Sequence, residues 1–133
     1  MPNEKPSFKF NKAEHLCSIK TVDLVFETGK KINVNPFRFI WIESATTDNV
    51  KLKIAFSVPK KFFKRAVDRN KIKRHMREAY RIHRDKQLSQ IANSGKQFAA
   101  MLVFNAREPL PYSETEAKII LTLQRFAKEA CKN

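Results

Sequence analysis

The pattern of apolar and polar positions predicts three helices and four extended segments. Helical segments repeat apolar residues every three or four positions, whereas extended segments alternate or form short apolar runs. In chain order, the segments are helix, strand, strand, strand, helix, strand and helix, at residues 18–28, 32–34, 37–42, 50–58, 67–91, 98–104 and 113–130. The chain is therefore predicted to form a single α+β domain of order α-β-β-β-α-β-α.

The extended segments differ in how much of each we expect to be buried. Residues 37–42 are aromatic and β-branched, as is typical of strands. Residues 50–58 alternate apolar side chains with basic and small ones, which predicts a half-exposed strand after a turn at residues 46–49. Residues 98–104 are an unbroken apolar run, which predicts burial on both faces. Strand 50–58, the long helix and strand 98–104 would then form a β-α-β unit.

Polar and small residues mark the expected helix ends. Ser18 is predicted to cap the first helix at its start, and Gly29 follows its end. The sequence Asn-Ser-Gly at 93–95 should end the central helix. Ser113 and Glu116 have the spacing of a capping box at the start of the closing helix.

The central helix combines an apolar stripe with a one-sided basic row. At about 100° per residue, one arc of the helix holds Ala79, Ile72, His83, Met76 and Tyr80. Beside it, over about 140°, lie Arg69, Lys73, Arg84, Arg77, Asn70, Arg81 and Arg74, with no acidic residue among them. An ordinary solvated face mixes charges of both signs, because like charges repel. The segregation therefore favours a polyanionic partner, and Arg in particular pairs bidentately with phosphate.

Composition supports this interpretation. A chain of 133 residues with 42% apolar residues and eleven Phe can bury the core of one domain. Its formal net charge of +14 makes nucleic acid the first partner to consider. Twelve of its 27 Lys and Arg residues lie at positions 60–86. Residues 1–12 are polar and contain two prolines, so we expect a flexible arm there and the domain at residues 13–133.

Other function classes have little support in the sequence. No long apolar run, lipidation signal or signal-peptide core is present, so we expect a cytoplasmic protein without a membrane partner. Cys17 and Cys131 belong to no C-x-x-C pair and are expected to be free thiols. The three His residues lack metal-ligand spacing, so no zinc site is predicted.

Residues 69–78, RNKIKRHMRE, resemble the R-N-x-x-K-R-x-x-R-E signature of the protein subunit of bacterial ribonuclease P. Residues 58–61 and 66–67 resemble the V-S-K-K and A-V segments that lead into that signature. Residues 25–29 resemble the family's V-F-x-x-G pattern, and residues 106–107 match its A-R element. The resemblance extends over roughly residues 16–128, in the order that the family has.

The resemblance implies a fold and an activity that the residue pattern alone does not. The implied fold is related to the second domain of ribosomal protein S5, with a left-handed crossover at the central helix. The implied activity is removal of the 5′ leader from precursor tRNA by a catalytic RNA that uses Mg²⁺, bound mainly by that RNA. The protein would bind the catalytic RNA and the leader and aid metal binding, with no catalytic residue and no protein oligomer required.

The resemblance also implies residue roles. The residues implied to contact the catalytic RNA are those that match the signature or the double lysine, together with Arg81 in the same row. They are Arg69, Asn70, Lys73, Arg74, Arg77, Lys60, Lys61 and Arg81. The implied leader-binding cleft lies on the sheet face beside the first helix and would be formed by Val22, Phe26, Arg38 and Ile40. From the sequence alone, Phe26 fits the core as well as the cleft.

The chain departs from the family pattern at three places. Val22 stands where the family often has Phe, so this position lacks an aromatic ring that could stack on a base. Pro59 replaces a common Ser, and residues 62–65 are bulkier than the usual glycine-containing loop. None of these departures touches the signature.

Two other functions compete with this interpretation. A nuclease acting alone would need clustered carboxylates for metal-assisted hydrolysis, and the 13 acidic residues are scattered outside the basic row. A non-catalytic structural RNA-binding protein, of the ribosomal or chaperone type, would show the same charge. Only the ordered signature separates that alternative from a ribonuclease P subunit.

Overall fold

The computed structural model describes residues 19–44 and 50–131. Its elements are α1 (Ile19–Thr28), β1 (Lys30–Val34), β2 (Phe37–Glu43), β3 (Leu52–Ser57), α2 (Ala66–Gln87), α3 (Ser89–Asn93), β4 (Phe98–Phe104) and α4 (Tyr112–Ala130). The predicted order is confirmed, with α3 as one additional short helix. The predicted arm at residues 1–12, the cap at Ser18, the turn at 46–49 and Cys17 lie outside the described residues.

The four strands form one sheet of order β1-β2-β4-β3. Strands β1, β2 and β4 pair antiparallel, and β3 pairs parallel with β4. The β-α-β unit is therefore confirmed, while the handedness of its crossover stays a prediction. β4 lies inside the sheet, and six of its seven residues are buried, as the apolar run predicted.

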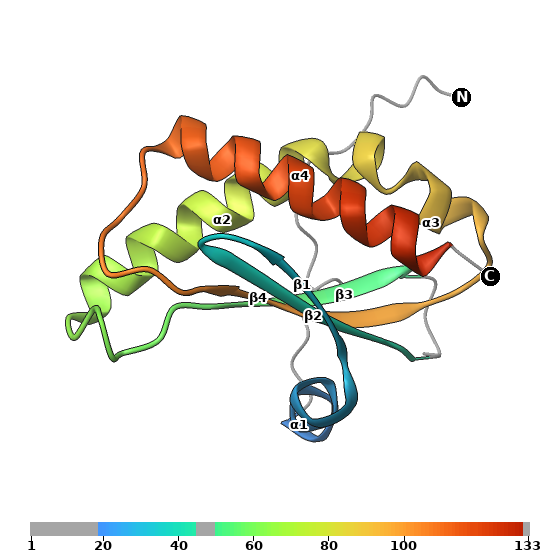
Figure 1. Ribbon diagram of the computed structural model, residues 1–133, viewed down its shortest axis with the longest axis horizontal. Helices are drawn as coiled ribbons and strands as arrows, with labels where there is room; N and C mark the ends of the chain where they lie inside the picture. The colour runs from blue at the N-terminus through green and yellow to red at the C-terminus, as the bar shows by residue number, and fades with distance from the viewer. Residues whose placement is uncertain (1–18, 45–49, 132–133) are drawn as a thin grey trace.

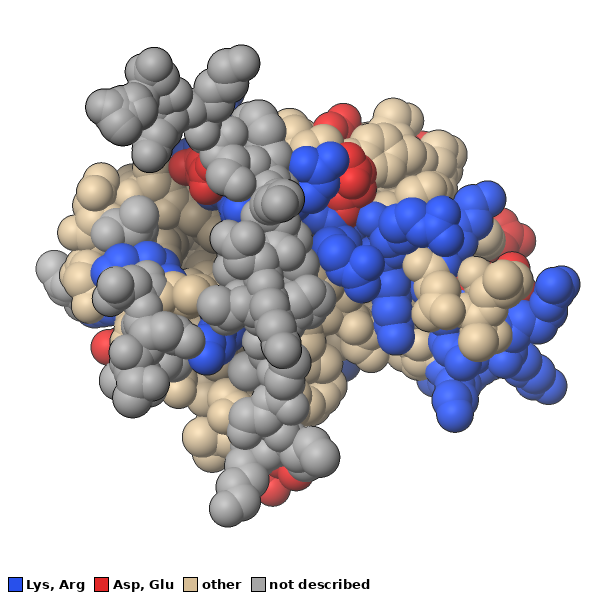
Figure 2. Space-filling model, turned by 180° about the vertical axis from the view of Figure 1, so that it is seen from behind, with Lys and Arg blue, Asp and Glu red and all other residues tan. Residues whose placement is uncertain are grey.

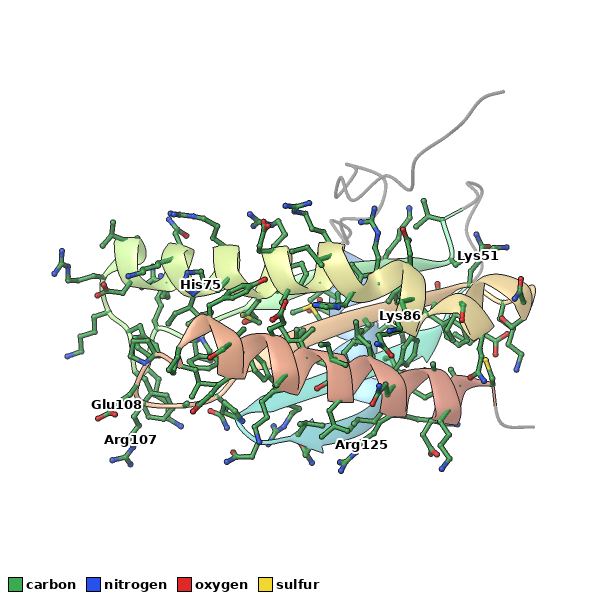
Figure 3. The ribbon with its side chains drawn as sticks, turned by 90° about the horizontal axis from the view of Figure 1, so that it is seen from above. Lys51, His75, Lys86, Arg107, Glu108 and Arg125 are labelled. Atoms are coloured by element: carbon green, nitrogen blue, oxygen red, sulfur yellow. The ribbon has the colours of Figure 1, made fainter. Side chains whose placement is uncertain are left out.

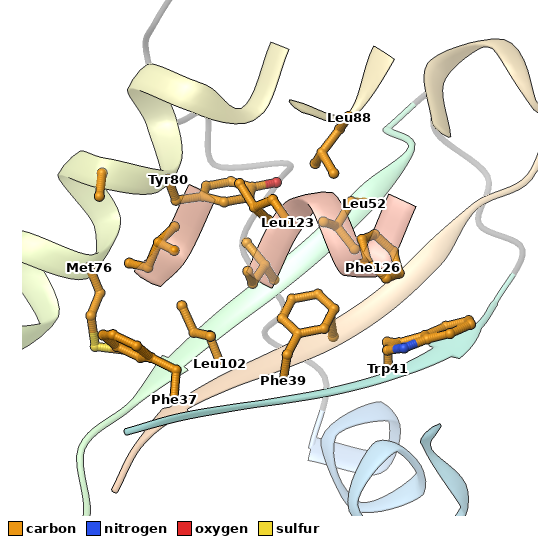
Figure 4. Packing of buried hydrophobic residues seen from close by; sticks show 14 of the residues in the cluster. Phe37, Phe39, Trp41, Leu52, Met76, Tyr80, Leu88, Leu102, Leu123 and Phe126 are labelled. Carbon is orange, nitrogen blue, oxygen red and sulfur yellow. The ribbon is translucent and has the colours of Figure 1, made fainter. Parts of the chain in front are cut away.

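Helices cover both faces of the sheet (Figure 1). Helices α2 and α4 lie side by side on one face, and α1 crosses the other. β2 supplies both cores by strict alternation, because successive side chains point to opposite faces. Phe39 and Trp41 enter the larger core, where each ring packs on Phe126 of α4 at centroid distances of 4.8 and 5.2 Å (Figure 4). Ile40 enters the smaller core with Val25 of α1.

Gly29 allows α1 to lie close to the sheet. A Cβ built at this position would lie 2.4 Å from the carbonyl oxygen of Val25 and 2.6 Å from Cγ2 of Ile40. Its backbone does not adopt a left-handed conformation, whereas that of Gly95, after α3, does, with φ of +76°. Gly29 is therefore required for close approach, and Gly95 for a turn that other residues rarely adopt.

Two predicted helix ends are wrong. The central helix does not continue to Ile91: α2 ends at Gln87, and after the turn at Leu88 the chain enters α3, which lets both Leu88 and Ile91 be buried. The capping box does not form, because α4 begins at Tyr112 and no side chain caps it. Glu116 instead makes a hydrogen bond of 2.8 Å with Nε2 of His83, which links α4 to α2.

Two further observations concern the cysteine and the helices. Cys131 is a free, half-buried thiol, as predicted. Within residues 19–44 and 50–131, none of the helices has the length and apolar character that crossing a bilayer requires.

Candidate RNA-binding surfaces

The basic row of α2 lies on the side of the helix turned away from α4. On the opposite side, the ring of His75 contacts Tyr112, and His83 reaches Glu116, both on α4. Most of the row remains accessible: Asn70 and Arg74 are exposed, and Lys73 and Arg77 are partly exposed. Together, these last four residues are called the α2 row below.

The members of the α2 row have no acidic partner. Among the described residues, Lys73, Arg74 and Arg77 form no ion pair, so no neighbouring carboxylate neutralises their charges. Arg81 differs, because it pairs with Glu78 and this hydrogen bond raises the pKa of its guanidinium. Arg84 differs more. It is only 8% exposed, so its predicted place on the basic surface is wrong.

Arg69 holds the basic loop that precedes α2. Its Nη1 donates hydrogen bonds of 2.8 Å to the carbonyl oxygens of Phe63 and of Lys64. No side chain caps the start of α2, and this guanidinium ties the loop immediately before the helix to the first turn of the helix. The loop carries Lys60 and Lys61, both exposed. Seen from behind, Lys and Arg side chains gather at this end of the molecule (Figure 2).

Sequence reasoning missed two residues of this basic end. The ring of Phe62 lies between two cations, with Nζ of Lys61 at 5.0 Å and the guanidinium carbon of Arg107 at 5.7 Å from its centroid. Cations over an aromatic face are attracted by its quadrupole, so Phe62 positions both charges. The A-R element at residues 106–107 was the only signal for Arg107. Its contact with residue 62 depends on tertiary packing that no local pattern encodes.

A second surface lies on the sheet face that α1 crosses. The strand register aligns Asn33 with Arg38, Arg38 with Val103, and Val103 with Ser57, so one line of side chains runs from β1 to β3. We call these four residues the cross-strand row. In the next line along the strands, Ile40, Met101 and Ala55 are aligned in the same way, and α1 packs over them.

The four residues predicted for the leader-binding cleft have different environments. Phe26 on α1 is 47% exposed, so it is not a core residue. Arg38 is exposed within the cross-strand row, and Val22 is partly buried against the smaller core. Ile40 is 2% exposed beneath α1, so its side chain is closed to a ligand in this conformation. Phe26 and Arg38 are therefore the members that a ligand can reach.

Neither surface offers a ligand set for a metal ion. Within the described residues, no group of three or more His, Cys, Asp or Glu side chains comes together. The chemistry available to both surfaces is instead ion pairing, hydrogen bonding and ring stacking.

Fold and surfaces together define a small α+β protein that presents, among its described residues, a row of unpaired cations on one helix and a second, less charged surface on the sheet face that α1 crosses. A sequence model of the family described as Ribonuclease P matches residues 10–128, and the chain belongs to this family. It is 31% identical over 134 residues to the ribonuclease P protein component of Chlorobaculum tepidum, covering 97% of this chain and 82% of that relative. It is 37% identical over 79 residues to that of Porphyromonas gingivalis, covering 59% of this chain and 58% of that relative.

Solved structures support the fold. The RNase P protein of Staphylococcus aureus superposes with a TM-score of 0.68 at 19% identity, covering 88% of this chain and 97% of that chain. The RNase P protein of Thermotoga maritima gives a TM-score of 0.65 at 23% identity, covering 84% and 96%. The expected α+β architecture is therefore confirmed.

Proposed function

We propose that the protein is the RNA-binding subunit of a ribonuclease P ribonucleoprotein that removes the 5′ leader from precursor tRNA in the cytoplasm. The observation that carries this proposal is the α2 row, where signature residues share one helix face and, among the described residues, form no ion pair with a carboxylate. Guanidinium and ammonium groups presented in this way suit the phosphates of a folded RNA. One copy of the protein suffices for this role.

The two surfaces would bind different parts of the assembly. The α2 row, the exposed pair Lys60 and Lys61, and Arg107 beside Phe62 would contact the catalytic RNA. The cross-strand row and the exposed ring of Phe26 would contact the single-stranded leader, since stacking on an aromatic side chain suits unpaired bases. Val22 and Ile40 would support that cleft from beneath.

The protein would not perform the hydrolysis. Its described residues provide no carboxylate cluster that could bind Mg²⁺ directly. The RNA would hold the metal ions that activate the nucleophile. Cations of the α2 row would aid metal binding indirectly, because they hold the RNA in the conformation that binds those ions.

Reconstitution tests the proposal. Purified protein added to a ribonuclease P RNA should accelerate cleavage of precursor tRNA at low Mg²⁺, where the RNA alone is slow. Cleavage without the RNA would instead indicate a protein nuclease. Binding to RNA without any effect on cleavage would favour the alternative, a structural RNA-binding protein.

A further inference from the structure

Two arginines from different elements meet at the free edge of β1. Nη1 of Arg125, on α4, lies 3.3 Å from the carbonyl oxygen of Asn33 and donates to it. Nε of Arg38, on β2, donates to the side-chain oxygen of the same residue at 3.4 Å. Asn33 thus holds two guanidinium groups, one through its main chain and one through its side chain. Arg125 lies on the side of α4 opposite α2 (Figure 3).

The edge is positively charged and has unused donors. Lys31 lies two residues before Asn33 and shares its face of the strand. Among the described residues, Lys31, Arg38 and Arg125 form no ion pair. Each guanidinium donates one hydrogen bond to an oxygen of Asn33 and has further N–H groups that could donate to an anion. We call Lys31, Asn33, Arg38 and Arg125 the β1-edge site.

The β1-edge site continues the cross-strand row. Asn33 and Arg38 belong to both, so a ligand lying along the row from β3 arrives at this edge. The row crosses three strand spacings, about 14 Å in all. At its other end, Ser57 lies only three residues before Lys60 and the basic loop. The two ends therefore differ: one borders the surface proposed for the catalytic RNA, and the other opens away from it.

We infer that the β1-edge site binds backbone phosphates of leader nucleotides upstream of those in the cross-strand row. This inference rests on the proposed function, because it extends the path of the leader. The charge of the site and its two guanidinium groups, each held by a hydrogen bond to Asn33, suit phosphodiester oxygens. The catalytic RNA is the less suitable occupant, since the α2 row that would bind it faces the opposite side of the molecule.

The test compares two precursor tRNAs that differ only in leader length. The short leader ends within the cross-strand row, and the long leader has roughly twice that length. With the reconstituted complex, the long leader should bind more tightly. Arg125→Ala should abolish this gain, about fivefold at most, which is the upper range for an exposed ion pair. Binding of the short leader and of the catalytic RNA should not change.

Two further variants separate the site from general charge. Lys128→Ala removes the same charge from an exposed position on α4 and should keep the gain. Asn33→Ala changes neither the total charge nor the main-chain carbonyl that Arg125 contacts, but it removes the side-chain oxygen that holds Arg38. This variant should lose part of the extra affinity for the long leader. The inference would be overturned if Arg125→Ala and Lys128→Ala reduced the extra affinity of the long leader equally. It would also be overturned if Arg125→Ala left that extra affinity undiminished.

The outcomes also distinguish the inference from the function on which it rests. If Phe26→Ala weakens binding of both leaders while Arg125→Ala keeps the length-dependent gain, the leader cleft stands and the β1-edge site fails. If neither leader adds affinity over mature tRNA in the unmodified protein, leader binding itself fails.

Discussion

The two candidate surfaces are built in opposite ways. The α2 row comes from one continuous stretch of sequence and consists of cations with one amide. The cross-strand row takes one residue from each of four strands and contains a single cation, Arg38. Charge therefore dominates the first surface, whereas the second has one cation among polar and apolar side chains, and the helix that crosses its sheet face carries the exposed ring of Phe26.

The difference in charge determines what each surface can recognise. A row of unneutralised cations attracts phosphates whatever the sequence, and its affinity falls steeply with salt. A less charged strip beside an exposed ring gains affinity by stacking, which requires bases that are unpaired. We therefore expect substitutions in the α2 row to weaken binding of the catalytic RNA and to reduce its salt dependence. Substitutions in the second surface should weaken binding of the leader with little change in salt dependence.

The largest effect is expected from Arg74→Ala combined with Arg77→Ala. Losing two charge-assisted contacts should weaken binding of the catalytic RNA by about 3 kcal/mol. The log–log dependence of affinity on salt should flatten by up to about 2 units, since each phosphate contact contributes nearly one. Filter binding over a salt series measures both quantities.

A matched control removes the same charge elsewhere. Lys86 and Lys128 are exposed and lie outside the α2 row, so replacing both by Ala should have a much smaller effect. Similar losses in the two double variants would mean that net charge, and not the row, determines affinity.

A smaller effect is expected from Phe26→Ala. Loss of stacking on a leader base should weaken binding of precursor tRNA to the complex by about 1–3 kcal/mol. Binding of mature tRNA should not change, and the salt dependence should stay the same. Leu24→Ala is the control, because Leu24 lies on the same helix and is also 47% exposed. Equal effects on precursor and mature tRNA would place Phe26 outside the leader path.

The sequence predicted features that one segment encodes by itself. The α2 row follows from helical periodicity, and the buried β4 from seven consecutive apolar residues. The signature identified the family because its spacing lies within one helix. Phe26 could not be assigned to core or surface, because its exposure depends on how α1 sits on the sheet.

Features that depend on contacts between distant segments were not predictable. Asn33 meets Arg125 because α4 packs beside the β1 edge, and Phe62 meets Arg107 because two loops adjoin. Glu116 has a capping sequence but bonds to His83, since a partner on the neighbouring helix competes with the local cap. Arg84 followed the periodicity of the row, yet its side chain is buried in the folded protein, and helical periodicity alone does not reveal this burial.

The smallest effect is expected from Arg69→Ala, which tests whether a signature residue acts through the loop. Its two hydrogen bonds to loop carbonyls are partly exposed, so their loss should destabilise the fold by about 1 kcal/mol. Amides of residues 60–65 should exchange hydrogen faster, as mass spectrometry can measure. RNA affinity should fall because Lys60 and Lys61 are no longer held in place.

The control for Arg69 is Lys64→Ala, which removes one exposed charge from the loop but keeps its carbonyl group. It should leave exchange at residues 60–65 unchanged. Arg69→Lys keeps the charge, yet the lysine side chain is one bond shorter, so its ammonium does not reach the position from which Nη1 contacts both carbonyl oxygens, and exchange should stay fast. If Arg69→Lys restored slow exchange and full affinity, charge would account for Arg69. It would then belong with Arg74 and Arg77 as a phosphate contact, and the loop would need another explanation for its order.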